Sequence, residues 1–278
     1  MMKAYGILLC AGFGTRLKPL TDTIPKPAVP FLGRPMVWYA MHALKQTGIT
    51  TFAANVHHLP ERMADCLQQC AQNLELAKVH IFRENGEILG TGGGARSCLS
   101  LIPDADRYII YHGDVLCHAD LGAALNSHAS SGCDVTLVVA PRPQNSKLGM
   151  IGVDSNHHIV QIRDWYRADY DTSQLPMKAC FTGIHIIERR LLETLELGKN
   201  ICLVTEIYRR MLEQNQPINA CLTNTFFADI GTPETYFEAQ RTIWNHPELL
   251  SGADPRLFPS KLVEDWSEFC HTALRSLV

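Results

Sequence analysis

An apolar run near the start of the chain ends in small residues, and positively charged residues follow within one proline-rich loop. The run reads ILLC from residue 7, and the residues behind it that could bind an anion are Ala11, Gly12, Gly14, Thr15, Arg16, Lys18 and Lys26. Glycines let backbone N–H groups approach an anion closely, and cations neutralise its charge. A plain glycine-rich turn does not explain cations held in a loop stiffened by prolines. The spacing therefore predicts a phosphate-binding loop.

The loop fits neither of two widespread phosphate-binding fingerprints. A Walker loop needs Gly-Lys-Ser or Gly-Lys-Thr at a fixed distance behind a glycine, and that string is absent from the sequence. A dinucleotide fingerprint needs a third glycine where Leu17 stands, and Pro19 disfavours an immediate helix. The next expected strand ends at Asn55 and not at an acidic residue that could hold a ribose hydroxyl. These departures argue against a nicotinamide or flavin cofactor.

The order and spacing of this loop resemble the signature of a known family. The strings that carry the resemblance are AGFGTRL from residue 11, PLT from residue 19 and PKP from residue 25. They resemble the sugar-nucleotide pyrophosphorylases, which join an NTP to a sugar 1-phosphate. The mannose-1-phosphate guanylyltransferases and N-acetylmuramate-1-phosphate uridylyltransferases look closest, and Ala11 departs mildly from the glycine of many members. The resemblance implies a nucleotide-diphospho-sugar transferase fold and a magnesium-dependent nucleotidyltransferase.

Two aspartates match the positions at which the family binds Mg²⁺. Asp114 follows an apolar run and Gly113, and Asp229 opens the string DIGTPE. A triphosphate is bound as its magnesium complex, and Mg²⁺ prefers one or two carboxylates together with phosphate oxygens and water. A lone Asp at a strand end is also a common helix cap or turn former. Together with the signature loop, the pair predicts a magnesium site.

The resemblance also implies roles for the signature residues. Arg16 and the backbone of residues 12–15 are expected to bind the NTP phosphates, beside Ala11. Lys26 is expected near the α-phosphate, where it would offset the charge that develops there. The predicted catalytic group is therefore Arg16, Lys26 and Asp114.

A second glycine-rich run, residues 90–94, is expected at the nucleobase. No side chains intrude there, so the backbone of Gly92 and Gly93 could lie against a flat base, as this region does in the family. Glu84, Glu87 and Thr91 could read the edges of the base, and a carboxylate would suit guanine. A flexible turn in front of a helix is the plain alternative.

The sugar-phosphate side departs from the family pattern. Gly149, Gly183 and Glu206 fall where relatives approach the hexose. Many relatives have a Glu-Lys-Pro string after a strand, but here the chain reads Arg163-Asp164-Trp165. The lysine that holds the sugar phosphate is thus missing from its usual position. Arg163 is expected to replace it, with Lys178 as the alternative.

These expectations favour GTP and mannose 1-phosphate as the substrates. Three alternatives remain open at this point. The first is UTP with N-acetylmuramate 1-phosphate or another hexose 1-phosphate, and the second is CTP with phosphocholine. The third belongs to another class, a non-catalytic sugar-nucleotide sensor or regulatory subunit, and the presence of Arg16, Lys26, Asp114 and Asp229 weighs against it.

Composition limits the compartment and the partners. The chain has 278 residues and a formal charge of −3, which argues against a nucleic-acid surface. No apolar run approaches the roughly 20 residues of a membrane span. The 10 cysteines are scattered without a C-x-x-C pair, as is typical of free cytosolic thiols. The sequence predicts a cytoplasmic protein without nucleic-acid or membrane partners, and it leaves a homo-oligomer open.

Short apolar strands alternate with amphipathic helices, which predicts an α/β fold with a Rossmann-like, mostly parallel mixed sheet flanked by helices. Strands are expected at residues 5–10, 51–55, 79–83, 107–112, 134–139, 150–153, 158–162, 179–187 and 218–222. Helices are expected near residues 35–47, 60–73, 95–101, 120–131, 190–197 and 203–214, and from residue 233. Ligands of such sheets bind beyond the carboxyl ends of the strands. Four loops should meet there, namely residues 11–26, 84–94, 112–116 and 228–232.

The expected domain is a catalytic unit over residues 1–245. Its nucleotide-binding half spans about residues 1–140, and its sugar-binding half spans about residues 141–245. Residues 246–278 form a tail with a helical stretch near 262–277, which would serve as a cap or an oligomer contact. No hexapeptide repeat is present, so no left-handed β-helix domain is expected.

Overall fold

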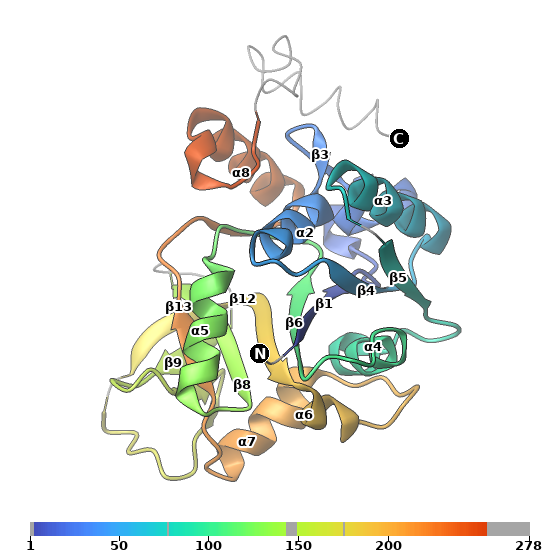
Figure 1. Ribbon diagram of the computed structural model, residues 1–278. Helices are drawn as coiled ribbons and strands as arrows, with labels where there is room; N and C mark the ends of the chain where they lie inside the picture. Colours follow the sequence, from blue (N-terminus) through green and yellow to red (C-terminus); the bar gives the residue numbers. More distant parts are fainter. Residues whose placement is uncertain (1–2, 77, 143–148, 175, 255–278) are drawn as a thin grey trace.

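A mixed sheet runs through the centre of the molecule, with helices on both faces (Figure 1). The computed structural model describes residues 3–76, 78–142, 149–174 and 176–254. The first half of the chain supplies four parallel strands in the order β6-β1-β4-β5. They are β1 (Ala4–Leu9), β4 (Thr51–Val56), β5 (Lys78–Arg83) and β6 (Arg107–His112).

Both faces of these strands are buried, which explains why they read as apolar runs rather than as alternating patterns. Leu8 of β1 packs in one core with α2 (Met36–Gln46) and α3 (Pro60–Asn73). Its neighbour Ile7 packs in a second core on the other side, with α4 (Gly90–Cys98). Figure 1 shows α2 and α3 on one side of the sheet and α4 on the other. The sheet is therefore the middle of three layers.

The second half of the chain extends the same sheet with mostly antiparallel strands. The long strand β12 (Met177–Glu188) pairs antiparallel with β6, with β8 (Val135–Pro141) and with β9 (Met150–Val153). The remaining strands are β10 (Ile159–Ile162), β11 (Trp165–Tyr166) and β13 (Asn219–Leu222), the last of which lies parallel to β8. Helix α5 (Leu121–Ser131) precedes β8, and Asp120 caps it by accepting a bond from the Ala123 N–H at 2.8 Å. The predicted α/β fold is confirmed, with parallel pairing concentrated in the first half.

Several short elements shape the edge of the sheet that the four loops share. A small ladder joins β7 (Val115–Cys117) to β14 (Phe227–Asp229). The signature loop contains η1 (Thr15–Leu17), α1 (Leu20–Thr23) and η2 (Lys26–Ala28), and the hairpin β2 (Pro30–Phe31) and β3 (Arg34–Pro35) follows it. Sequence periodicity did not predict these elements, because each is too short to show a period.

The helices of the second half differ in detail from the expected ones. Helix α6 (Arg189–Glu193) is shorter than predicted. In place of one helix over residues 203–214, a π-helical turn, η4 (Val204–Tyr208), leads into α7 (Arg209–Glu213). Such turns are frequent at functional sites. Helix α8 (Pro233–Asn245) begins at the predicted proline, and a short turn, η5 (Pro247–Leu249), follows.

The remaining expectations concern the C-terminal tail, the domain boundary, a β-helix domain and membrane-spanning helices, and the described residues bear on some of them. The expected helix near residues 262–277 lies outside the described residues, and the boundary near residue 140 stays a prediction. The described residues build no left-handed β-helix. Across the ranges that the structure covers, no helix has the length and apolar character needed to cross a membrane.

Helix α4 begins within the glycine run, because another part of the chain docks on its first turn. Ile201 donates its N–H to the Leu89 carbonyl at 2.9 Å, and its own carbonyl accepts the Gly92 N–H at 2.8 Å. Leu203 donates its N–H to Thr91 Oγ1 at 2.9 Å. Residues 199–203, here called the clasp, thus bind the amino end of α4.

The clasp predicts an unusual response to alanine at Gly93. In a helix interior, alanine is normally favoured over glycine by about 1 kcal/mol. A Cβ at Gly93 would instead lie 2.1 Å from the Lys199 carbonyl oxygen, so the backbone of the clasp must move. We expect Gly93→Ala to lower the free energy of unfolding by about 2 kcal/mol, measured by urea denaturation.

The matched control is Gly12→Ala. No atom lies within 4 Å of the Cβ that would be added there. Its free energy of unfolding should stay within about 0.5 kcal/mol of the wild-type value. Equal stability of both variants would contradict the tight docking of the clasp.

Candidate active site

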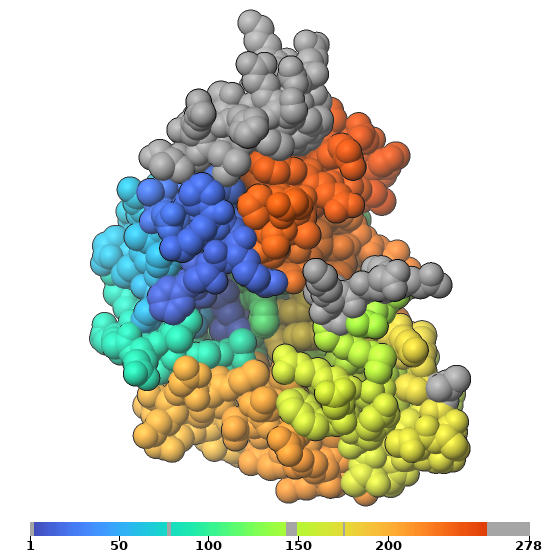
Figure 2. Space-filling view, turned by 180° about the vertical axis from the view of Figure 1, so that it is seen from behind, coloured from blue at the N-terminus to red at the C-terminus, as the bar shows by residue number. Residues whose placement is uncertain are grey.

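A cavity of about 350 Å³ opens at the carboxyl ends of β1, β4 and β6. The register of the sheet explains its position, because Leu9 at the end of β1 pairs with both Asn55 and His112. The lining residues are Leu9, Ala11, Gly12, Gly14, Thr15, Arg16, Lys26, Pro27, Asn55, Ile88, Gly90, Thr91, His112, Asp114 and Gly231. Figure 2 shows the corresponding recess, where the blue N-terminal segment faces orange and yellow-green segments.

The signature loop reaches the cavity through a tight turn at Gly14. Gly14 has φ 63°, in the left-handed region that favours glycine. A Cβ there would lie 2.8 Å from Thr21 Cγ2 and 2.9 Å from Lys26 Cβ. Thr21 Oγ1 also donates to the Gly14 carbonyl at 2.9 Å. The turn is thus packed from within, and it presents Gly12 and Thr15 to the cavity.

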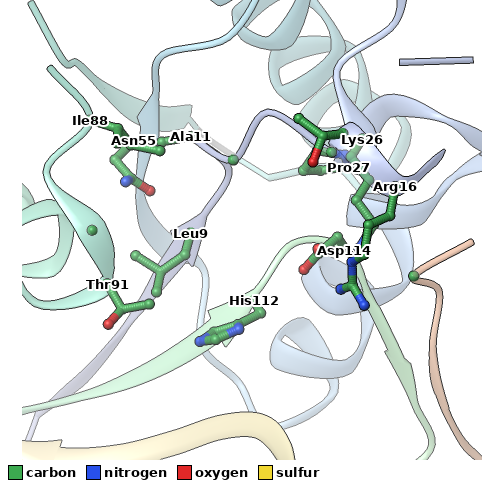
Figure 3. A pocket seen from close by; sticks show the side chains of 15 residues that line it. Leu9, Ala11, Arg16, Lys26, Pro27, Asn55, Ile88, Thr91, His112 and Asp114 are labelled. Atoms are coloured by element: carbon green, nitrogen blue, oxygen red, sulfur yellow. Dashed lines mark hydrogen bonds and ion pairs between the residues drawn. The ribbon is translucent and has the colours of Figure 1, made fainter. Parts of the chain in front are cut away.

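An ion pair joins the signature loop to the end of β6. Lys26 Nζ lies 2.5 Å from Asp114 Oδ2, and the two side chains are 8% and 30% exposed. Burial by itself raises the pKa of the Asp114 carboxyl, but the Lys26 ammonium and His112 outweigh it, so the pKa is lower than usual. Asp114 is therefore an anion at neutral pH. In Figure 3, Lys26, Arg16 and Asp114 gather on one side of the cavity.

The β7–β14 ladder brings the second aspartate beside the first. Asp229 pairs with Val115, the residue after Asp114. Both carboxylates affect the nearby imidazole of His112. Burial and the charge of Lys26 lower the pKa of His112, whereas Asp114 and Asp229 raise it, and the net effect is a lowered pKa. Among the described residues no group of three or more His, Cys, Asp or Glu side chains gathers as a metal site. A pair of carboxylates that leaves other positions to phosphate and water suits Mg²⁺, so the residues fit the predicted ion.

Arg16 lies beside the segment that follows β14. A Cβ on Gly231 would lie 3.1 Å from Arg16 Nη1, so the guanidinium rests against the backbone just behind Asp229. Lys18 turns away from the cavity and pairs with Asp22 at 2.8 Å, where both side chains are about half exposed (57% and 49%). Of the cations in the signature loop, Arg16 and Lys26 are therefore the ones that line the cavity.

Glu84 does not line the cavity, and both of its carboxylate oxygens accept hydrogen bonds from other parts of the chain. Oε1 accepts the Asn55 side-chain amide at 2.7 Å, and Oε2 accepts the Leu89 N–H at 2.8 Å. Asn55 in turn accepts the Cys10 N–H through Oδ1 at 3.0 Å. Glu84 thus positions the loops around the cavity. Asn55 lines the cavity, although the sequence indicated only that a strand ends there.

Gly92 and Gly93 lie within α4 and are buried under the clasp. A Cβ on Gly92 would lie 2.8 Å from Ile201 Cγ2. Among the described residues, Gly90 and Thr91 are the members of this glycine run that line the cavity. Contact of Gly92, Gly93 and Glu84 with a nucleotide stays a prediction.

The residues predicted for the sugar phosphate fall into three places. Gly149 and Arg163 line a second cavity of about 150 Å³, together with Leu137, Met150, Ile151, Ile162, Phe181, Val204 and Tyr208. Gly183 has φ 81° and packs against His112, where a Cβ would lie 3.2 Å from its ring. Glu206 is exposed on η4 and lines neither cavity. Lys178 is also exposed and lines neither of them.

His112 is a cavity residue that sequence reasoning did not select. It is the last residue of β6 and lies two residues before Asp114. Figure 3 shows it between the Arg16–Asp114 side of the cavity and the side formed by Leu9 and Thr91. The signal was available in the string His112-Gly113-Asp114, since a strand end beside a predicted metal ligand faces the same space.

The ion pair predicts how Asp114→Asn changes stability. The substitution leaves the Lys26 charge in a buried position without its partner, and we expect the free energy of unfolding at pH 7 to fall by about 2 kcal/mol. Because the folded-state pKa of Asp114 is lowered, its contribution is present above the ordinary value of 3.8 and is lost as pH falls through the folded-state value.

Urea unfolding of wild type and variant checks this expectation. The difference should persist from pH 7 to about pH 5 and narrow in more acid solution. Asp22→Asn removes the partner of Lys18 in an exposed pair and should cost less than about 1 kcal/mol. An equal cost for both variants would show that the Lys26–Asp114 pair adds nothing beyond a surface contact.

Known proteins resemble this chain in both sequence and fold. The UTP–glucose-1-phosphate uridylyltransferase of Synechocystis is 27% identical over 87% of this chain and 63% of its own length. A rice protein named "Probable mannose-1-phosphate guanylyltransferase 1" is 28% identical over 86% of this chain and 64% of its own length. The chain thus spans less than two thirds of these relatives.

A solved structure of HddC from Yersinia pseudotuberculosis has the same fold. It matches with a TM-score of 0.69 and 24% identity over 87% of this chain and 100% of its own. A second structure of HddC, complexed with GMP-PN, matches with a TM-score of 0.68 and 23% identity over the same shares. The family model described as nucleotidyl transferase matches residues 5–246. The family predicted from the signature loop is confirmed, and this chain belongs to the nucleotidyl transferase family.

Proposed function

We propose that the chain transfers a nucleotidyl group from an NTP to a sugar 1-phosphate, giving an NDP-sugar and pyrophosphate. One observation carries this proposal. The glycine-containing turn, Arg16 and Lys26 of the signature loop line one cavity with Asp114, which comes from a distant part of the sequence. Such a set of open backbone, cations and a carboxylate suits a metal-bound polyphosphate.

The NTP phosphates would lie over the signature turn. Gly12 and Thr15 line the cavity, and because Gly12 has no side chain, its backbone is uncovered there. Arg16 at the cavity mouth offers a fork of donors that matches phosphate oxygens. Lys26, held by Asp114, offers a fixed positive charge. These groups are preorganised, so they need little rearrangement when a triphosphate binds.

Asp114 and Asp229 would hold Mg²⁺. When bound there, the ion would neutralise charge on the phosphate oxygens. The Lys26–Asp114 pair keeps one carboxylate ionised and fixed before any ion arrives. The β7–β14 ladder pairs Asp229 with Val115, the residue after Asp114.

The chemistry requires positioning more than proton transfer. A phosphate oxygen of the sugar 1-phosphate forms a bond to the α-phosphorus, and the bond from that phosphorus to the β-phosphate oxygen breaks. The attacking oxygen is already anionic, so no general base is needed. Pyrophosphate carries away the electron pair of the broken bond. Arg16 and Lys26 would offset the charge on the transferring group, as fixed cations do in phosphoryl transfer.

GTP and mannose 1-phosphate are the pair that we propose. The rice relative at 28% identity is named for this reaction, whereas the Synechocystis relative is named for UTP and glucose 1-phosphate. Glu84 does not support a preference for guanine, because both of its carboxylate oxygens already accept hydrogen bonds from Asn55 and Leu89. Glu87 is exposed beside the cavity residue Ile88 and is the carboxylate of that loop still free to read a base.

A substrate panel tests the proposal. The full chain is incubated with Mg²⁺, each of four NTPs, and mannose, glucose or N-acetylmuramate 1-phosphate or phosphocholine, and pyrophosphate release is measured. We expect the highest kcat/KM for GTP with mannose 1-phosphate. Tight binding of a sugar nucleotide without pyrophosphate release from any pair would reject catalysis and favour a sensor.

Lys26→Met should reduce kcat sharply with the pair that the panel identifies. The substitution removes a fixed charge next to the transferring phosphate, and we expect a loss on the order of 10² to 10³. Lys18→Met is the control, because Lys18 lies in the same loop but pairs with Asp22 outside the cavity. Its kcat should stay within about twofold, since an exposed pair contributes little. Similar losses in both variants would count against the role of Lys26.

A further inference from the structure

Four aromatic or imidazole rings form a wall between the two cavities. His112 lines the 350 Å³ cavity, and Phe181 and Tyr208 line the 150 Å³ cavity. His185 lies between them and is fully buried. Its ring centroid lies 5.3 Å from that of His112 and 4.5 Å from that of Phe181.

Hydrogen bonds run through this wall from one cavity to the other. The Tyr208 hydroxyl lies 2.6 Å from His185 Nδ1, and His185 Nε2 lies 3.2 Å from His112 Nε2. With Nε2 bonded to His185, Nδ1 is the nitrogen of His112 left for a ligand. Among the described residues no hydrogen bond to that Nδ1 is formed.

The two fully buried members of this chain, His185 and Tyr208, determine how its protons are arranged. Burial lowers the pKa of His185 well below its ordinary value, and the nearby His112 lowers it further, so His185 is neutral. Burial likewise raises the pKa of the Tyr208 hydroxyl well above its ordinary value, so the hydroxyl keeps its proton. A neutral His185 carries one N–H, so the direction of its hydrogen bond to Tyr208 determines the direction of its hydrogen bond to His112.

Two directions are available, and they give His112 opposite characters. If Tyr208 donates to His185, then His185 Nε2–H donates to His112, and His112 presents Nδ1–H to its cavity. If the chain runs the other way, His112 presents a bare lone pair, and the Tyr208 proton needs a different acceptor. The described residues supply no other acceptor for that hydroxyl. A buried donor without a partner is costly, so the first direction is preferred.

The charges near His112 favour the same direction. Arg16 and Lys26 line the same cavity as His112, and this is the space that would hold anionic phosphates. An N–H facing phosphates is attracted to them, whereas a lone pair is repelled.

The position of His112 in the sheet indicates which phosphate it meets. On one side His112 pairs with Leu9 of β1, which leads into the signature loop. On the other side Gly183 of β12 packs against its ring, and β12 also provides Phe181 of the second cavity. The signature loop would take the NTP phosphates. The acceptor phosphate would then lie in the first cavity, on the side of this wall and next to His112.

We propose that Tyr208 and His185 fix His112 as an Nδ1–H donor to the phosphate of the acceptor. This inference rests on the proposed function for the identity of the ligand. His112 would contact the substrate, and His185 and Tyr208 are positioning residues that act through it. The π-helical turn η4 ends at Tyr208 and follows the clasp, so the same segment that binds α4 also places the hydroxyl.

The first test needs no activity. Long-range ¹H–¹⁵N NMR correlations of the labelled full chain report which nitrogen of each imidazole is protonated, and His112→Asn and His185→Gln assign the signals among the 12 histidines. We expect Nδ1–H for His112 and Nε2–H for His185. Protonation of His112 at Nε2 would overturn the proposal. In Tyr208→Phe the fixed assignment should give way to a mixture of tautomers, and an unchanged pattern would also overturn it.

The second test is kinetic and uses the substrate pair that the panel identifies. His112→Ala should raise the KM of the sugar 1-phosphate about tenfold or more, as expected for loss of a hydrogen bond to a charged group, while the KM of the NTP stays within about twofold. His112→Asn should restore much of this loss, because the Asn amide N–H can occupy the position of Nδ1–H. Tyr208→Phe should raise the same KM less, and Tyr170→Phe, which removes an exposed hydroxyl, should not raise it.

These experiments separate a failure of the proposed function from a failure of the role given to His112. If the wild type releases no pyrophosphate with any pair, the proposed function is wrong, and the NMR test still decides the proton arrangement. If the wild type is active but His112→Ala leaves the KM of the sugar 1-phosphate unchanged, or raises the KM of the NTP alone, the assignment of His112 to the acceptor is wrong.

Discussion

The Lys26–Asp114 ion pair is the interaction on which the site depends. It joins residues 88 positions apart, one from the signature loop and one from the end of β6. The pair holds a cation that is almost fully buried and an anion that is one-third exposed, so either group alone would be costly at that depth. Its net contribution to stability is modest, but its effect on geometry is large, because the loop cannot leave the sheet without separating the charges.

Two further constraints place the rest of the site around that pair. The parallel register sets the ends of β1, β4 and β6 level, so that the cavity opens where three strands stop together. The short β7–β14 ladder then returns the chain to the same edge and pairs Asp229 with Val115, the residue after Asp114. The site is thus built from one ion pair, one strand register and one small ladder.

Structural features formed by residues close together in the sequence could be predicted, whereas contacts between residues far apart in the sequence could not. The phosphate loop was found because its glycines and cations lie within 20 residues of one another. The network of Glu84, Asn55 and the Cys10 N–H was missed, because its members lie on three different strand ends. The glycine run at residues 90–94 was predicted to lie against a nucleobase, and that contact stays a prediction. The group that approaches this run in the structure is the clasp, which is more than 100 residues away in the sequence. Strand β7 and strand β14 were too short for any periodicity.

The β7–β14 ladder also has a consequence for how the protein is made. The ribosome delivers the N-terminus first, so Arg16, Lys26 and Asp114 emerge long before Asp229. Arg16 and Lys26 lie in the loop that follows β1, and Asp114 follows β6, so all three are made before β12 and β13. Asp229 becomes available to the β7–β14 ladder only after β13 has been synthesised. A growing chain therefore contains both partners of the Lys26–Asp114 ion pair well before it contains both strands of the β7–β14 ladder.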